Sequence, residues 1–134
     1  MTMPIAPPSP PPIPCPGRLG CAWSEHGRKH FPHRGLRPEH TRSGPAKYLP
    51  GTTDDQIRSI ETTTVGTPGL VLSPPPGKSE YVRSMDRVIG WDLGQDATIS
   101  FAECSGGVAA GRSYHGRPMA PSNPKLRGTP YAGD

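Results

Sequence analysis

Proline is the feature that most limits what this chain can fold into. Eight of the 20 prolines lie within residues 1–16 of the 134, and all 17 glycines follow them. Because each proline fixes φ at about −65° and removes a backbone donor, we predict that residues 1–20 are a disordered leader of polyproline II or coil. We expect one small domain at residues 21–118 and a flexible tail at residues 119–134.

Within that domain the patterns predict helices first and strands afterwards. A helix is expected over residues 22–31, although Gly27 weakens it by about 1 kcal/mol relative to alanine. Thr53 and Gln56 have the spacing of a capping box, which predicts a second helix ending near residue 64. Apolar segments between glycine-rich turns predict strands at residues 70–72, 81–91, 97–104 and 108–114. The predicted fold class is therefore α+β, with one or two N-terminal helices followed by an antiparallel sheet of about four strands.

The charges are unevenly distributed along the chain. The net charge is +4, but residues 18–47 hold seven Lys or Arg against two acids, together with four of the five histidines. Residues 52–105 hold eight acids against four Lys or Arg, and residues 106–134 are basic again. If the fold joins the two basic segments, they form a basic face suited to a polyanion such as RNA. An ordinary solvated basic surface explains the same charges equally well.

Cysteine usage and hydropathy indicate where such a chain works. Three cysteines without a secretory signal do not suggest a disulfide framework, so we expect free thiols in a reducing compartment. The first 16 residues have neither a positive start nor an apolar stretch. No apolar run approaches the roughly 20 residues that a membrane span needs. We therefore expect a cytoplasmic protein.

The motif His26-Gly-Arg-Lys-His30 places two histidines four residues apart, on one face of the expected helix. One interpretation is a zinc site that adds one or more cysteines, although the upstream spacing is too short for a zinc finger. A second is acid–base chemistry, in which imidazoles exchange protons while Lys29 holds a phosphate. A third is an ordinary polar surface helix.

A second group of reactive side chains closes the last predicted strand. Ser113, His115 and Arg117 supply a hydroxyl, an imidazole and a guanidinium within five residues. Cleavage of RNA without a metal needs a base for the 2′-OH, an acid for the leaving 5′-oxygen and a cation for the transition state. Two histidines with a Lys or Arg can supply all three, so we expect neither a metal nor a cofactor.

The chain also resembles the C-terminal toxin domains of bacterial polymorphic toxin systems, in particular the barnase/EndoU/colicin/RelE-like group of ribonucleases. The resemblance covers residues 22–118 and rests on the runs at 26–31, 43–51, 86–91, 106–107 and 115–118. It implies one or two helices before a four-stranded antiparallel sheet, with RNA as the substrate and an acidic immunity protein as a partner. It also implies that the domain is delivered as part of a secreted toxin.

The resemblance also implies roles for individual residues. Catalysis would join a helix to the last strand, and substrate-binding residues would lie around them. The implied catalytic residues are His26, Lys29, His30, Ser113 and His115, and the implied substrate-binding residues are Arg28, Lys47, Tyr48 and Arg117. The alternative is a non-catalytic basic module that binds RNA or a protein, including a degenerate toxin remnant.

Overall fold

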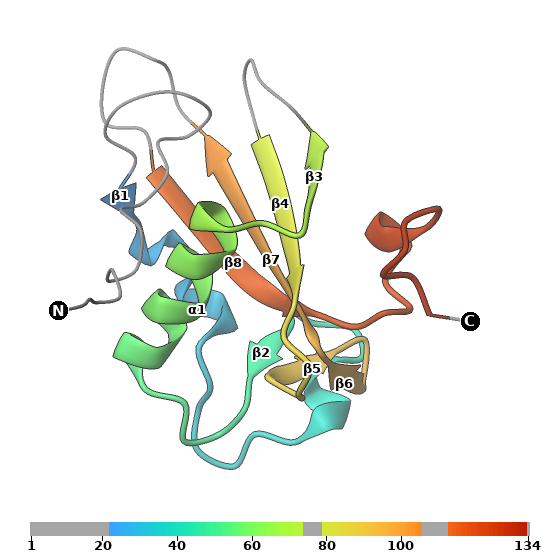
Figure 1. Cartoon of the computed structure of the whole chain (residues 1–134). Coiled ribbons are helices and arrows are strands. Elements are labelled where there is room, and N and C mark those ends of the chain that lie inside the picture. Colours follow the sequence, from blue (N-terminus) through green and yellow to red (C-terminus); the bar gives the residue numbers. More distant parts are fainter. Residues whose placement is uncertain (1–21, 74–78, 106–112, 134) are drawn as a thin grey trace, which may run out of the picture.

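The computed structural model describes residues 22–73, 79–105 and 113–133 (Figure 1). The proline-rich leader expected at residues 1–20 lies outside the described residues. The remainder is α+β, as predicted, with one α-helix packed on a sheet and a second small sheet at one end. Among the described residues, no helix is both long and apolar enough to span a membrane.

The α-helix α1 (Asp54–Gly66) begins where the sequence predicts it. The Thr53 side chain accepts a hydrogen bond from the Gln56 backbone N–H, and the Gln56 side chain accepts one from the Thr53 N–H. This reciprocal pair confirms the capping box and satisfies two of the unpaired donors at the helix start. The buried residues of α1 form one stripe: Ile57, Ile60, Glu61, Thr64 and Val65.

The helix expected over residues 22–31 does not form. That segment is a short strand β1 (Ala22–Trp23) followed by a 3₁₀-helix η1 (Glu25–His30). Two causes act together: Gly27 disfavours an α-helix, and Trp23 pairs with Tyr114 in a parallel ladder. In a 3₁₀-helix with about three residues per turn, positions four apart do not share a face. The α-helical face on which residues 26 and 30 were expected to lie together therefore does not form.

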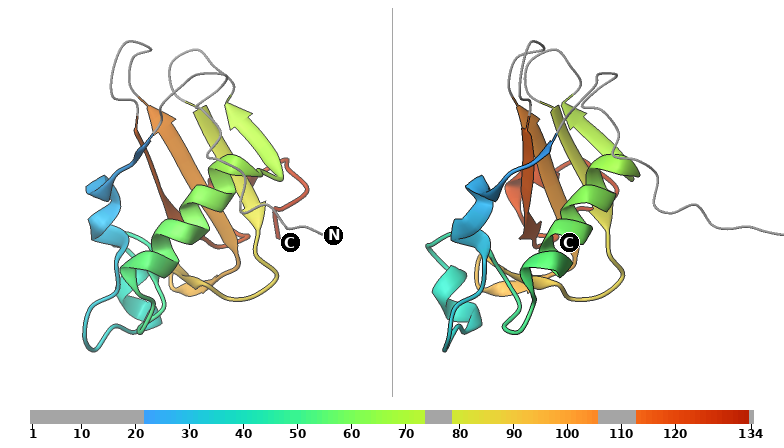
Figure 2. Two further views of the ribbon diagram at one scale, coloured as in Figure 1. Left: turned by 60° about the vertical axis from the view of Figure 1, so that its left-hand side comes forward. Right: turned by 90° about the vertical axis from the view of Figure 1, so that its left-hand side faces the viewer.

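The larger sheet has the order β1-β8-β7-β4-β3, and every pair except β1–β8 is antiparallel. The strands β3, β4, β7 and β8 give the expected antiparallel sheet of four strands, although β5 and β6 lie between β4 and β7 in the chain. The last strand was expected at residues 108–114; β8 begins at Ser113, and residues 108–112 lie outside the described residues. The smaller antiparallel sheet has the order β2-β5-β6. The strands are β2 (Lys47–Tyr48), β3 (Leu70–Ser73), β4 (Ser79–Ser84), β5 (Gly90–Asp92), β6 (Gln95–Ala97), β7 (Ile99–Ser105) and β8 (Ser113–Met119). Helix α1 covers one face of the larger sheet (Figure 2).

The strand predicted at residues 81–91 is divided between the two sheets. β4 ends at Ser84, and Asp86 adopts a positive φ of 56° that extended strands do not allow. The chain then enters β5 and turns at Leu93 and Gly94, both with positive φ. Two such residues in succession make the tight turn that joins β5 to β6.

The segment expected to be a flexible tail is packed instead. β8 continues to Met119, and a short 3₁₀-helix η3 (Pro124–Leu126) follows. Leu126 is fully buried with Val82, Ile99, Phe101 and Met119, on the sheet face opposite α1. The segment folds back because the part of that face formed by Val82, Ile99, Phe101 and Met119 is apolar and would otherwise be exposed to water.

Cys104, the one cysteine within the described residues, is disulfide-bonded. The expectation of a free thiol is therefore wrong for this residue. Cys104 is also fully buried, in the cluster that β7 forms with Val65 of α1. A disulfide at this position restrains the strand whose opposite face carries Glu103.

Candidate active site

The sheet face opposite α1 gathers polar side chains from three adjacent strands. Side chains alternate between the two faces of a strand, and Ala102, Cys104 and Tyr114 point toward α1. The intervening residues therefore point the other way. Cross-strand pairing aligns them in two rows, Glu80–Glu103–His115 and Val82–Phe101–Arg117.

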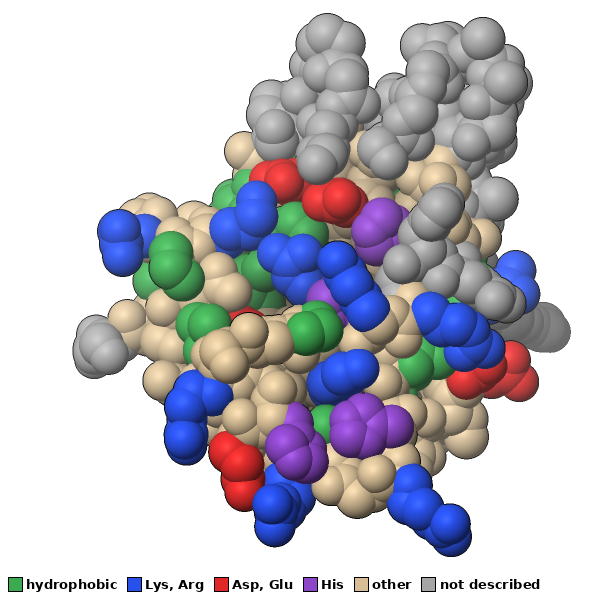
Figure 3. All heavy atoms as spheres, turned by 180° about the vertical axis from the view of Figure 1, so that it is seen from behind, with side chains coloured by type: hydrophobic (Ala, Val, Ile, Leu, Met, Phe, Trp, Pro, Cys, Tyr) green, Lys and Arg blue, Asp and Glu red, His purple; other side chains and the backbone are tan. Residues whose placement is uncertain are grey.

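Glu103 and His115 are direct cross-strand partners on β7 and β8. His115 Nε2 lies 3.7 Å from Glu103 Oε2, and both side chains are about one-fifth to one-quarter exposed. Figure 3 shows this face, with two acidic side chains beside a histidine. A carboxylate and an imidazole in contact at a water-accessible surface are a competent proton-transfer pair.

Two cations flank this pair. The Arg117 guanidinium lies 4.6 Å from the centre of the Phe101 ring, and Lys125 Nζ lies 5.2 Å from the same centre. Lys125 also donates a hydrogen bond to Glu80 Oε2 over 3.0 Å. The packed C-terminal segment thus contributes a charge to the sheet face, and both cations are placed to attract an anion at Glu103 and His115.

The backbone behind this pair is held tightly. A Cβ at Gly116 would collide with the Phe101 carbonyl oxygen, so only glycine fits between His115 and Arg117. On the α1 side, the buried Glu61 carboxylate accepts a hydrogen bond from the Gly116 backbone. The same carboxylate accepts bonds from Trp23 Nε1 (2.8 Å) and from the Tyr48 hydroxyl (2.7 Å). These contacts hold the backbone of β8 in place between His115 and Arg117, so they limit the movement of both side chains.

His30 lies inside the domain rather than on its surface. It is 4% exposed, and its Nδ1 is 2.7 Å from the Ala46 carbonyl oxygen. A carbonyl only accepts hydrogen bonds, so Nδ1 carries the proton of neutral His30 and Nε2 remains an acceptor. Burial, together with the positive charges of Arg117, Lys29 and His115, lowers the pKa of His30 to about 4, and the hydrogen bond with Ala46 opposes this shift. His30 is thus electrostatically coupled to the site and neutral at pH 7.

A fall in pH is expected to destabilise the domain through His30. The unfolded chain binds a proton at this residue below about pH 6.5, whereas the folded chain binds it only near pH 4. Above about pH 6.5 His30 is neutral in both states and does not change the free energy of unfolding. As the pH falls from about 6.5 to about 4, the free energy of unfolding decreases by about 3 kcal/mol, because only the unfolded chain gains a proton. Urea unfolding at pH 7 and pH 4.5 measures this loss. His30→Asn keeps a donor for Ala46 but does not titrate, so its free energy of unfolding is expected to fall less; equal losses in both proteins would contradict the prediction.

The structure brings some of the other predicted residues to this face and separates others. Ser113 shares the outward face of β8 with His115 and Arg117. Lys29 is exposed next to His30, and the side chain of His26 lies outside the description. Lys47 is half-buried on β2.

Two predicted substrate-binding residues have other roles. Tyr48 is completely buried, and its hydroxyl donates to Glu61, so it cannot contact a substrate. Burial raises the pKa of Tyr48 well above its ordinary value. Arg28 lies 3.4 Å from Asp54 at the start of α1 and 4.8 Å from the centre of the Phe31 ring.

Three residues of this face were not predicted as site residues: Glu80, Glu103 and Lys125. The alternation of residues 97–104 places Glu103 on the same strand face as Phe101. The register that sets Glu103 against His115 depends on the turn between β7 and β8, and no pattern in the sequence fixes it.

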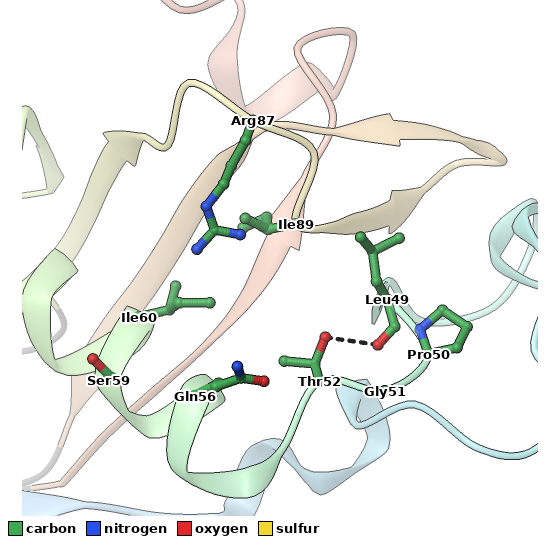
Figure 4. A pocket seen from close by; sticks show the side chains of 9 residues that line it. All are labelled: Leu49, Pro50, Gly51, Thr52, Gln56, Ser59, Ile60, Arg87 and Ile89. Carbon is green, nitrogen blue, oxygen red and sulfur yellow. Dashed lines mark hydrogen bonds between the residues drawn. The ribbon is translucent and has the colours of Figure 1, made fainter.

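An open pocket of about 410 Å³ lies between the start of α1 and the segment before β5 (Figure 4). Its lining includes Arg87, Gln56, Ser59 and Ile60, and Thr52 donates to the Leu49 carbonyl oxygen at its rim. Neither a carboxylate nor a histidine lines it, so it offers no acid–base pair.

The described residues contain no group of three or more His, Cys, Asp or Glu side chains placed to hold a metal ion. Comparisons with protein-family models, curated proteins and solved structures found no match to this chain.

Proposed function

We propose that this domain is a metal-independent endoribonuclease of the toxin type. The observation that supports the proposal is the contact between Glu103 and His115, with Arg117 and Lys125 beside it on one sheet face. A general base, a general acid and phosphate-binding cations are the three parts that 2′-OH attack requires. The pair of histidines inferred from sequence is replaced by a carboxylate and a histidine.

In the proposed reaction, the Glu103 carboxylate takes the proton of the ribose 2′-OH. The 2′-oxygen attacks the adjacent phosphorus, and the bond from phosphorus to the 5′-oxygen of the next nucleotide breaks. Protonated His115 gives its proton to that leaving oxygen. The products are a 2′,3′-cyclic phosphate and a free 5′-OH, and no water is consumed in this step.

The cations stabilise the charge that builds on the phosphate. Arg117 presents a planar set of donors that matches two phosphate oxygens, and Lys125 adds a second positive charge. His30, which the charge of Arg117 helps to keep neutral, adds no competing positive charge. Ser113 supplies a hydroxyl on the same strand face.

The proposed partners follow from this activity. RNA is the substrate, and the basic face is the surface that an acidic immunity protein would cover to block cleavage. Delivery as part of a secreted toxin, with action in the cytoplasm of the target cell, belongs to the same proposal.

The decisive experiment uses a short RNA in EDTA and a matched oligonucleotide with one 2′-deoxy residue. We expect cleavage of the RNA to a 2′,3′-cyclic phosphate, detected by mass spectrometry. We expect no cleavage immediately after the 2′-deoxy residue, because that position lacks the attacking oxygen. Cleavage there, or products with a 5′-phosphate, would contradict the mechanism. Salt-sensitive binding without turnover would favour the non-catalytic RNA-binding alternative.

A further inference from the structure

The loop of residues 33–42, which includes the short 3₁₀-helix η2 (Pro38–Thr41), carries an exposed cluster that the proposed reaction does not use. The rings of His33 and His40 are in contact, with centroids 5.8 Å apart and planes inclined by 31°. Three exposed arginines lie in the same loop, at positions 34, 37 and 42. The single acid of the loop, Glu39, is paired with Arg37 at 3.3 Å. The loop thus combines aromatic rings with uncompensated positive charge.

The backbone of this loop is anchored, so the cluster is held in place before any ligand binds. Thr41 is fully buried, and its hydroxyl donates to the Pro38 carbonyl and accepts from the Gly94 N–H. Leu36 is also buried, and Gly35 has the positive φ of 77° that the turn needs. A preformed surface loses less entropy on binding than a mobile loop.

Hydrogen bonds also fix the two rings. His33 Nδ1 donates to the Arg34 carbonyl, and His40 Nδ1 accepts from the Arg37 N–H. With each Nδ1 occupied, the neutral rings present an acceptor on His33 and a donor on His40 at their Nε2 edges. Exposed aromatic rings with polar edges suit the flat faces and edges of unpaired bases.

The cluster shares its face of the molecule with the candidate active site. Figure 3 shows histidine side chains at the upper and the lower end of this face, with Lys and Arg side chains between them. The connection along the chain also places the cluster near the candidate active site. His33 follows His30 by three residues, and the charges of Arg117 and His115 act on His30. Three residues span at most about 11 Å. A strand bound at Arg117 therefore needs few further nucleotides to reach the loop.

We propose that the loop of residues 33–42 is a second RNA subsite, which stacks unpaired bases on His33 and His40 and holds their phosphates with Arg34 and Arg42. The proposal rests on the proposed ribonuclease function and adds to it that the substrate is single-stranded RNA longer than the cleaved dinucleotide. Stacking of unpaired bases on these aromatic rings is expected to raise the affinity for a longer strand about tenfold.

The test measures binding of a fluorescent single-stranded 2′-O-methyl RNA decamer by anisotropy. This probe has no free 2′-OH, so its binding does not depend on nuclease activity. The double variant His33→Ala/His40→Ala is expected to bind about tenfold more weakly, and Arg34→Ala to lower the salt slope by about 0.7. Arg58→Ala, a surface arginine of α1 on the other side of the sheet, is the matched control and is expected to leave the affinity unchanged.

The outcomes separate this proposal from the proposed function. Weaker binding by the double variant supports the subsite, even in a protein that cleaves nothing. Unchanged binding by the double variant overturns it, even in an active ribonuclease. Equal displacement of the decamer by poly-glutamate of the same charge also overturns it, because the surface would then recognise acidic chains in general rather than bases.

Discussion

Replacing Glu103 with glutamine is expected to lower the rate constant for RNA cleavage by about 10²- to 10⁴-fold. Glutamine keeps the size and polarity of the side chain but cannot take a proton from the 2′-OH. His115→Ala is expected to cause a loss of the same order, because the leaving 5′-oxygen then departs without a proton. Single-turnover cleavage of a labelled RNA in EDTA measures both effects.

Further measurements make this prediction specific to proton transfer. The double variant is expected to lose little more than the worse single variant, as groups that act as a unit are not additive. Asp96→Asn, an exposed carboxylate on β6, is the control. A Glu103→Gln protein with wild-type rates would remove Glu103 from the mechanism.

The parts of the fold that the sequence predicted are those with a local cause. The capping box at Thr53 and Gln56 acts within four residues, so the start of α1 can be read directly. The strands at residues 70–72 and 97–104 follow from short apolar segments bounded by turns. Their order in the sheet follows from sequential antiparallel pairing, the commonest arrangement of neighbouring strands.

The parts that could not be predicted depend on distant contacts. Residues 22–23 form a strand because they pair with the edge of β8, where Tyr114, the partner of Trp23, lies 91 positions later in the chain. The segment after Pro118 packs because it covers an apolar sheet face. Its own proline-rich sequence contains no pattern that predicts this packing. The same limit applies to the site. His30 was predicted on a helix face together with His26, and it is buried instead. Glu103 was missed because neither strand alone determines which residues face each other across the sheet.

Truncating Glu61 to alanine is expected to lower the free energy of unfolding by about 3–5 kcal/mol. The substitution leaves Trp23 Nε1, the Tyr48 hydroxyl and the Gly116 N–H without their acceptor in a buried place. It also opens a cavity behind β8. Because small domains have only about 5–15 kcal/mol in total, this loss is expected to leave much of the protein unfolded at 37 °C. Urea denaturation followed by tryptophan fluorescence measures it.

Glu61→Gln removes the charge of this residue and keeps one acceptor oxygen for Trp23 Nε1. The amide nitrogen that replaces the other oxygen is a donor, so the Tyr48 hydroxyl has to turn and accept a hydrogen bond there instead of donating one. Burial raises the pKa of Glu61 above its ordinary value, so the folded state retains a proton that the unfolded chain releases. The stability contributed by Glu61 is therefore full below about pH 4.5 and falls as the pH rises through the folded pKa. Glutamine does not titrate, so the variant is expected to gain stability relative to wild type between pH 4.5 and pH 7. His30 titrates in both proteins and cancels in the comparison. A difference independent of pH would show that Glu61 is ionised as easily in the folded chain as in the unfolded one, and that its three donors fully offset its burial.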